Sequence, residues 1–189
     1  MISTSTRPSS TRPSSTRPSP AAPSSRAVSA PLVITLSIVV IALVTLGKPF
    51  VDIPGLVDGP AHAVRSIDTK LFDGFDRPNY WYAPWTNSLG NIALFIPLAA
   101  GLYARTKSFL LAVGASCAAS VGIEITQYVF ALGYTDIDDL FFNTIGGVLG
   151  AGLMVVIPRR EHPGLMRLAA VLLSLLLAGM TVLGLRYHL

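Results

Sequence analysis

Charged residues are scarce in this sequence of 189 residues, at 13% of the total. In soluble domains about a quarter of the residues are charged, so roughly half of the usual charge is missing here. Hydrophobic residues make up 51%, and the mean hydropathy is +0.58. This balance argues against an ordinary soluble domain and favours a chain that lies largely in lipid.

The motifs of common catalytic and metal sites are also missing. The single cysteine, Cys117, has no intrachain partner for a disulfide. The histidines have no metal-ligand spacing, and neither a serine nucleophile motif nor a phosphate-binding glycine loop occurs. The net charge of +4 sits mostly in the N-terminal segment and short loops, as is typical beside anionic lipid. We therefore expect no cofactor and no nucleic-acid partner.

The first thirty residues are of low complexity. Ser-Thr-Arg-Pro-Ser occurs three times in succession, followed by more Pro, Ser and Ala. Such a composition offers nothing apolar for a core, and it predicts a disordered cytoplasmic tail over residues 1–30. A cleaved signal peptide is the competing interpretation. The apolar stretch that follows is long for a signal peptide and lacks an A-x-A-like site, which favours a membrane anchor.

Five apolar runs follow the tail, and they predict an all-α polytopic bundle of about five transmembrane helices. The runs are Leu32–Leu46, Leu89–Tyr103, Phe109–Leu132, Phe141–Ile157 and Leu165–Leu185. A spanning helix needs about 20 residues, with a lower limit near 17. We therefore divide the chain into a first span (31–47), an outer segment (48–87), a core of three spans (88–157), and a basic inner loop with the fifth span (158–189).

Basic residues in the connections predict the orientation of the bundle in a bacterial cytoplasmic membrane. With the N-terminus inside, the inner segments hold Arg7, Arg12, Arg17, Arg26, Arg105, Lys107, Arg159, Arg160 and Arg167. The outer segments hold Lys48, Arg65, Lys70, Arg77 and Arg186. The turn at 105–107 is purely basic and the turn at 133–140 purely acidic. The predicted topology is N-terminus inside and C-terminus outside.

The outer segment contains an amphipathic stretch and an aromatic patch. Between Pro60 and Phe75, apolar residues recur at helical spacing, which predicts a short interfacial helix, although Asp68 breaks the pattern. Residues 80–85 read Tyr-Trp-Tyr-Ala-Pro-Trp just before the second span. This patch is typical of an aromatic belt at headgroup depth. A platform on which a substrate stacks is the alternative.

A polar stripe runs along the third span. Ser116, Ser120, Glu124 and Gln127 follow one another at spacings of four, four and three, which places them on one helical face. A charged side chain inside a membrane span, such as Glu124, costs a few kcal/mol or more unless it is paired, hydrated or protonated. The stripe is therefore expected to face other helices or a water-filled crevice, and Glu124 is a candidate functional residue.

The predicted topology gathers other polar residues at the same outer end. They are Asn91 in the second span, Asp136, Asp138 and Asp139 in the turn between the third and fourth spans, and Asn143 in the fourth. With Glu124 and Gln127 they form a candidate ligand site. The asparagines could instead join helices by hydrogen bonds. The aspartates could cap the fourth helix or hold a hard divalent cation.

Small residues indicate where helices approach one another closely. Gly146 and Gly150 form a small-xxx-small pair on the fourth span, and Gly147 adds a second smooth position. In the second span, Pro97 is expected to add a kink.

The same polar residues carry a resemblance to the VanZ-like family. The segments are Asn-Ser-Leu-Gly-Asn from residue 87, Gly-Ile-Glu-Ile-Thr-Gln from 122, and Asp-Ile-Asp-Asp-Leu-Phe-Phe-Asn-Thr-Ile-Gly-Gly from 136. The resemblance implies a small bacterial membrane protein associated with resistance to the glycopeptide teicoplanin. Similar proteins often have an arginine shortly before the Asp-rich block, where this chain has Gly133, Tyr134 and Thr135.

Three functions are compatible with these features. The first is a binding protein that engages a membrane lipid, a cell-wall precursor or a glycopeptide at an outward-facing polar site. The second is an enzyme acting on a lipid-linked substrate, with Glu124 as base and the aspartates on a metal ion. Transport is a third, but no inverted repeat is visible. We favour the binding protein over the enzyme, and homo-oligomerisation is left open.

Overall fold

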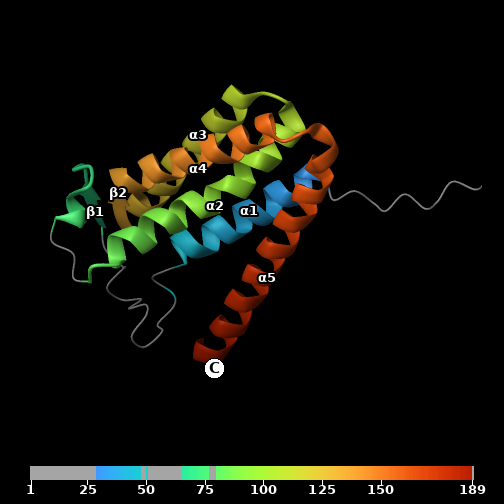
Figure 1. The fold of residues 1–189 in the computed structure, drawn as a ribbon. Helices are drawn as coiled ribbons and strands as arrows, with labels where there is room; N and C mark the ends of the chain where they lie inside the picture. Colours follow the sequence, from blue (N-terminus) through green and yellow to red (C-terminus); the bar gives the residue numbers. More distant parts are fainter. Residues whose placement is uncertain (1–28, 48–49, 51–64, 77–79, 189) are drawn as a thin grey trace, which may run out of the picture.

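The computed structural model describes residues 29–47, 50, 65–76 and 80–188. Within these ranges, five α-helices form a bundle whose helices run alternately up and down (Figure 1). They are α1 (Ala30–Leu46), α2 (Ala83–Thr106), α3 (Phe109–Phe130), α4 (Ile137–Val156) and α5 (His162–His188). The predicted all-α bundle is confirmed. The disordered tail falls almost wholly outside the described residues.

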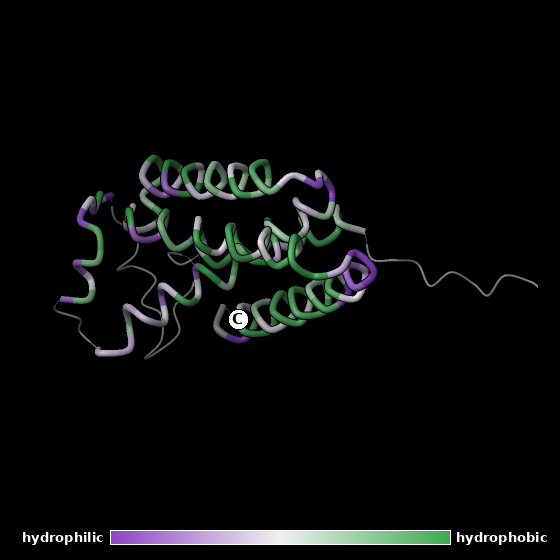
Figure 2. Tube along the Cα trace, turned by 45° about the horizontal axis from the view of Figure 1, so that its top comes forward, coloured by the Kyte–Doolittle hydropathy of each residue, from purple (hydrophilic) through white to green (hydrophobic). Residues whose placement is uncertain are grey.

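Four of the helices are long and apolar enough to cross a membrane, namely α2, α3, α4 and the helical stretch Arg159–Arg186, which contains most of α5. The fifth, α1, has 17 residues, which is the lower limit for a span. Hydrophobic residues follow the helices, and hydrophilic residues gather in the connections (Figure 2). Large apolar side chains face outward, such as Leu110 at 80% and Val156 at 82% exposure. Such an exposed apolar surface suits lipid as the surrounding medium.

The turns between helices are capped by residues with the appropriate chemistry. The Ser108 hydroxyl accepts the Leu111 N–H at 3.3 Å and begins α3, directly after Lys107 ends α2 in the left-handed conformation. The Asp136 carboxylate accepts the Asp138 N–H at 2.8 Å and begins α4. Both are ordinary N-caps. The predicted capping role of Asp136 is confirmed.

Glycines on α4 allow this helix to lie directly against α2. A Cβ atom at Gly146 or Gly150 would collide with the backbone carbonyl oxygens of Ile92 and Ile96, respectively. A Cβ at Gly147 would lie 2.9 Å from the Ser116 Cβ on α3. Small residues therefore bring three helix backbones close together, as the sequence predicts.

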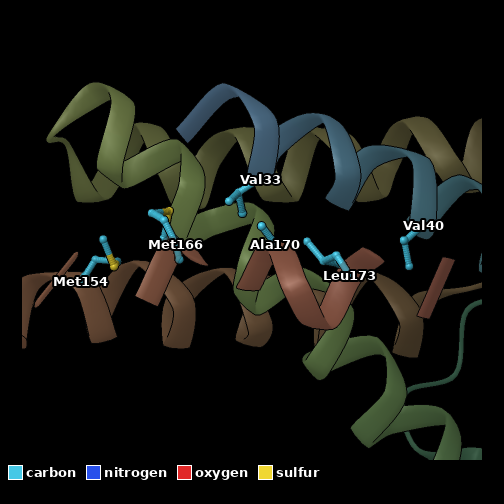
Figure 3. Packing of buried hydrophobic residues seen from close by; sticks show 7 residues of the cluster. Val33, Val40, Met154, Met166, Ala170 and Leu173 are labelled. Atoms are coloured by element: carbon cyan, nitrogen blue, oxygen red, sulfur yellow. The ribbon is translucent and has the colours of Figure 1, made fainter. Parts of the chain in front are cut away.

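An apolar cluster joins α1, α2, α4 and α5. Val33 and Val40 of α1 point toward Met166, Ala170 and Leu173 of α5 (Figure 3). All five side chains are buried, with Val33 and Val40 fully so. The cluster fixes the first half of α5, whereas the second half diverges from the bundle toward the C-terminus (Figure 1).

Two short strands occupy one end of the bundle, beside the end of α3 and the start of α4. β1 (Arg65–Asp68) and β2 (Gly133–Asp136) pair in parallel, with Arg65 opposite Gly133 and Asp68 opposite Asp136. We call this end of the bundle the strand end. The opposite end carries Arg105, Lys107, Arg159 and Arg160, and we call it the basic end.

The strands correct the expectation of a helix between Pro60 and Phe75. Residues 60–64 lie outside the described residues, but 65–68 form β1, and Asp73–Phe75 form only the short 3₁₀ helix η3. The reason is tertiary, because backbone pairing with β2 outweighs an apolar spacing that Asp68 already interrupted. The Asp68 carboxylate accepts the Lys70 N–H at 2.9 Å and turns the chain after the strand.

Candidate functional site

A pocket of about 560 Å³ opens at the strand end, between the two strands and the start of α2. Its polar lining comes from four parts of the chain. β1 and the residues after it supply Asp68, Lys70 and Asp73, while β2 and α4 supply Asp136 and Asp139. Asn87 of α2 and Gln127 of α3 complete the polar lining, together with Ser66, Thr69 and Tyr134.

Asp139 is held by two amides of α2. Its Oδ1 accepts hydrogen bonds from the Nδ2 atoms of Asn87, at 2.9 Å, and Asn91. Asn91 and Asp139 are 7% and 9% exposed, so this contact lies inside the bundle. The hydrogen bonds tie the start of α4 to the start of α2, which is the alternative role that the sequence allows for Asn91.

The polar stripe of α3 faces inward, and all four of its residues are buried. Ser120 accepts a hydrogen bond from the Asn143 Nδ2 on α4 at 2.9 Å. Gln127 donates from Nε2 to the Thr45 carbonyl oxygen on α1 at 3.1 Å. The amide oxygens of Asn143 and Gln127 are buried and have no hydrogen-bond partner among the described residues. Two strong acceptors therefore remain for a ligand or water.

Glu124 holds β2 rather than pointing at the large pocket. Its Oε2 accepts the Asp136 N–H at 3.0 Å, and its backbone carbonyl oxygen accepts the Thr135 hydroxyl at 3.2 Å. Glu124 is 8% exposed and lines a separate, mainly apolar cavity of about 330 Å³ on α3. Its carboxylate therefore positions the strand that carries Asp136 into the pocket.

Burial raises the pKa of Asp136 from its ordinary value of 3.8 to about 6. The hydrogen bond from the Asp138 N–H lowers this pKa, while repulsion from the carboxylates of Asp139, Asp138 and Asp68 raises it. Asp136 therefore changes its charge in a mildly acidic range.

The three aspartates of the acidic turn point in different directions. Asp136 caps α4, Asp139 faces the amides of α2, and the Asp138 Oδ1 accepts the Phe72 N–H at 2.8 Å. Among the described residues, no group of three or more His, Cys, Asp or Glu side chains is placed to hold a metal ion. The three aspartates thus do not converge on one point, because each carboxylate serves a different structural partner.

Aromatic rings attach the segment after β1 to the helices. Phe72, with a left-handed φ of 67°, packs against Phe141 and Phe142 of α4 at centroid distances of 5.4 and 6.0 Å. Phe75 packs edge-on against Trp85 of α2 at 5.2 Å. The predicted aromatic patch is largely exposed, with Trp81 at 79% and Tyr80 at 63%. That exposure fits a belt better than a closed stacking site.

Comparison with known proteins now identifies the chain. The family model described as VanZ/LLP1 matches residues 30–158, which comprise α1 to α4 and both strands. The chain belongs to the VanZ/LLP1 family. With four long apolar helices, this family member is a membrane protein. No solved structure matches it significantly.

A curated relative carries the family name. The "Protein VanZ" of Enterococcus faecium is 39% identical over 67 residues, which are 34% of this chain and 42% of that protein. The match thus covers less than half of the length of that VanZ protein.

An arginine of this VanZ-like chain, which sequence reasoning missed, lies beside the start of β2. Arg65 on β1 is the register partner of Gly133. Its Nε and Nη2 atoms each donate at 2.9 Å, to the carbonyl oxygens of Tyr128 and Val129 at the end of α3. The guanidinium also lies 5.7 Å from the centroid of the Tyr128 ring. Only the parallel pairing of distant segments reveals this position.

Proposed function

We propose that this VanZ-like membrane protein binds a cell-envelope molecule at the strand end and thereby contributes to envelope integrity or antibiotic resistance. The ligand classes are an envelope lipid, a cell-wall precursor and a glycopeptide. In this proposal the strand end faces the outside of the bacterial cytoplasmic membrane, and the basic end and N-terminus face the cytoplasm. Basic residues concentrate on the cytoplasmic side of membrane proteins, which supports this orientation.

The observation that carries the proposal is a roomy polar pocket whose floor is built from buried groups. Asp139 and Gln127 reach it from α4 and α3, and both are at most 9% exposed. Buried polar groups in membrane helices are costly, and they commonly mark ligand or ion sites. The pocket volume of about 560 Å³ lies in the range of small-molecule sites, which is about 300–1,000 Å³.

A binding role is favoured over a metal-assisted enzyme by the directions of the carboxylates. Glu124 accepts the Asp136 N–H and does not line the large pocket. The aspartates diverge, as described above, so the metal-assisted enzyme lacks its proposed base, Glu124, in the pocket and a converging set of metal ligands among the described residues. Binding requires only the pocket and its acceptors.

The proposal is tested by the phenotypes of two conservative variants. Asp139→Asn removes the negative charge that Asn87 and Asn91 hold in the pocket. Glu124→Gln weakens the hydrogen bond that positions β2. We expect both proteins to insert at wild-type levels, measured by quantitative immunoblot of membranes, and to lose any protection against teicoplanin or envelope stress.

The matched control is Glu161→Gln, which changes an exposed carboxylate at the basic end that pairs with Arg160. This variant is expected to keep the wild-type minimum inhibitory concentration. Wild-type phenotypes for both Asp139→Asn and Glu124→Gln, at normal membrane levels, would rule out the proposed site.

A further inference from the structure

The pocket at the strand end is strongly acidic. Its charged lining residues are Asp68, Lys70, Asp73, Asp136 and Asp139. Four carboxylates against one lysine leave a formal charge of −3 when all five groups are ionised. Concave sites lined by one sign of charge concentrate ligands of the opposite sign. The pocket therefore favours a cationic ligand over a phosphate.

Two of these carboxylates belong to residues that the sheet places opposite each other. Asp68 and Asp136 are register partners in the parallel pair of β1 and β2. Like charges directly opposite each other destabilise a sheet. Neither carboxylate forms an ion pair with another residue in the described part of the chain. A cation near both carboxylates would replace this repulsion by attraction.

A buried amide at the floor of the pocket gives an independent indication of a ligand. Gln127 is 2% exposed, and its side chain reaches the pocket lining. Its Nε2 is occupied by the Thr45 carbonyl oxygen, whereas its Oε1 accepts no hydrogen bond from the described residues. An unsatisfied buried acceptor destabilises a protein, and a ligand that donates a hydrogen bond to it offsets this cost.

The residues that line the pocket suit an organic ammonium group better than a bare metal ion. The described residues offer no converging set of three His, Cys, Asp or Glu side chains. A pocket of about 560 Å³ also has room for much more than one ion. An ammonium group carries a full positive charge and three hydrogen-bond donors. These donors match separated carboxylates and one amide oxygen.

We propose that the pocket binds the primary ammonium group of an amine-bearing polar head, with Asp68, Asp136 and the Gln127 amide oxygen as its acceptors. This inference rests on the proposed function, because it specifies the ligand class of the same site. Two sources share the chemistry, namely an ethanolamine lipid of the membrane and a soluble amino sugar. Asp139, held in place by the amides of α2, adds negative charge beside them.

The test uses two pairs of probes that differ in N-acetylation, which removes the positive charge of the nitrogen. The full chain is placed in phosphatidylglycerol nanodiscs, with phosphatidylethanolamine or its N-acetyl derivative as added lipid. The soluble pair is glucosamine and N-acetylglucosamine. Both tryptophans, Trp81 and Trp85, flank the strand end, so their fluorescence reports binding. We expect one amine to bind at least ten-fold more tightly than its acetylated partner, and the pair concerned identifies the source.

Variants connect this selectivity to the pocket. Asp68→Asn and Gln127→Met are expected to weaken amine binding at least five-fold while the thermal unfolding temperature stays near the wild-type value. Asp76→Asn is the control, because Asp76 is exposed on the same segment and does not line the pocket. Equal affinity for amine and acetylated probes, no binding of either amine, or undiminished binding by Asp68→Asn would overturn amine recognition.

The two proposals fail separately. If Asp139→Asn loses the envelope phenotype but the chain shows no amine selectivity, the proposed function stands and the inferred ligand class is wrong. If Asp139→Asn and Glu124→Gln retain the phenotype, the proposed function itself is wrong, whatever the probes show.

Discussion

The two amides that hold Asp139 should contribute unequally to the stability of the bundle. The Asp139 Oδ1 accepts from both Asn87 and Asn91, but Asn91 is 7% exposed and Asn87 is exposed. When Asp139 is replaced by Ala, the Asn87 amide can turn to water or headgroups, whereas the Asn91 amide remains buried. A buried donor without a partner costs about 1–3 kcal/mol.

The coupling free energy between Asp139 and each asparagine has an upper limit, which is set by what is known of hydrogen bonds between membrane helices. Measured couplings average about 0.6 kcal/mol and reach about 1.7 kcal/mol. We therefore expect a coupling of about 1–1.7 kcal/mol between Asp139→Ala and Asn91→Ala, and less than about 0.5 kcal/mol between Asp139→Ala and Asn87→Ala. The free energy of unfolding is measured by titration with SDS in mixed micelles. Equal couplings for the two amides, or a larger one for Asn87, would refute this reasoning.

Three further predictions follow from individual contacts. Gly150→Ala should cost about 1–3 kcal/mol by overpacking α4 against α2. Gly152→Ala should not destabilise the protein in the same micelle titration, because an added Cβ there meets no described atom within 4 Å beyond its own stretch of helix. Arg65→Ala should speed hydrogen exchange of the backbone amides at 133–136 in β2, because the paired strand β1 loses two hydrogen bonds to the end of α3. Arg65→Lys should not restore the protection, because lysine lacks the forked donors of the guanidinium group. The raised pKa of Asp136 means that the folded state binds its proton more tightly than the unfolded state. Wild-type stability should therefore fall relative to Asp136→Asn as the pH rises from about 4 to about 6, and the difference should be constant above that range; a pH-independent difference would contradict it.

The helices could be predicted from the sequence because hydrophobic burial in lipid has a simple length requirement. The apolar run Phe109–Leu132 becomes α3 (Phe109–Phe130), and the run Leu89–Tyr103 becomes the central part of α2. The polar stripe was also predictable, because a fixed helical period places Ser116, Ser120 and Glu124 on one face. Their inward orientation follows from the cost of exposing them to lipid.

The strand end could not be predicted from local patterns. β1 exists because Arg65–Asp68 meet a segment 68 residues further along the chain, and four-residue strands leave no clear periodicity. The contact of Phe72 with Asp138 depends on that docking as well. The divergence of the three carboxylates in the acidic turn was not predictable either, for a related reason. Three nearby carboxylates in a sequence do not converge when each is used by a different neighbour.

The account depends most directly on an outward-facing pocket at the strand end. Single cysteines are introduced into a Cys117→Ala chain, as Ser66→Cys in the pocket lining and as Thr106→Cys, exposed at the basic end. Thiols react when they are accessible to the reagent. A membrane-impermeant maleimide should label Ser66→Cys in intact cells and Thr106→Cys only after permeabilisation. Labelling of Thr106→Cys but not Ser66→Cys in intact cells would contradict the orientation and, with it, an envelope ligand on the outer face.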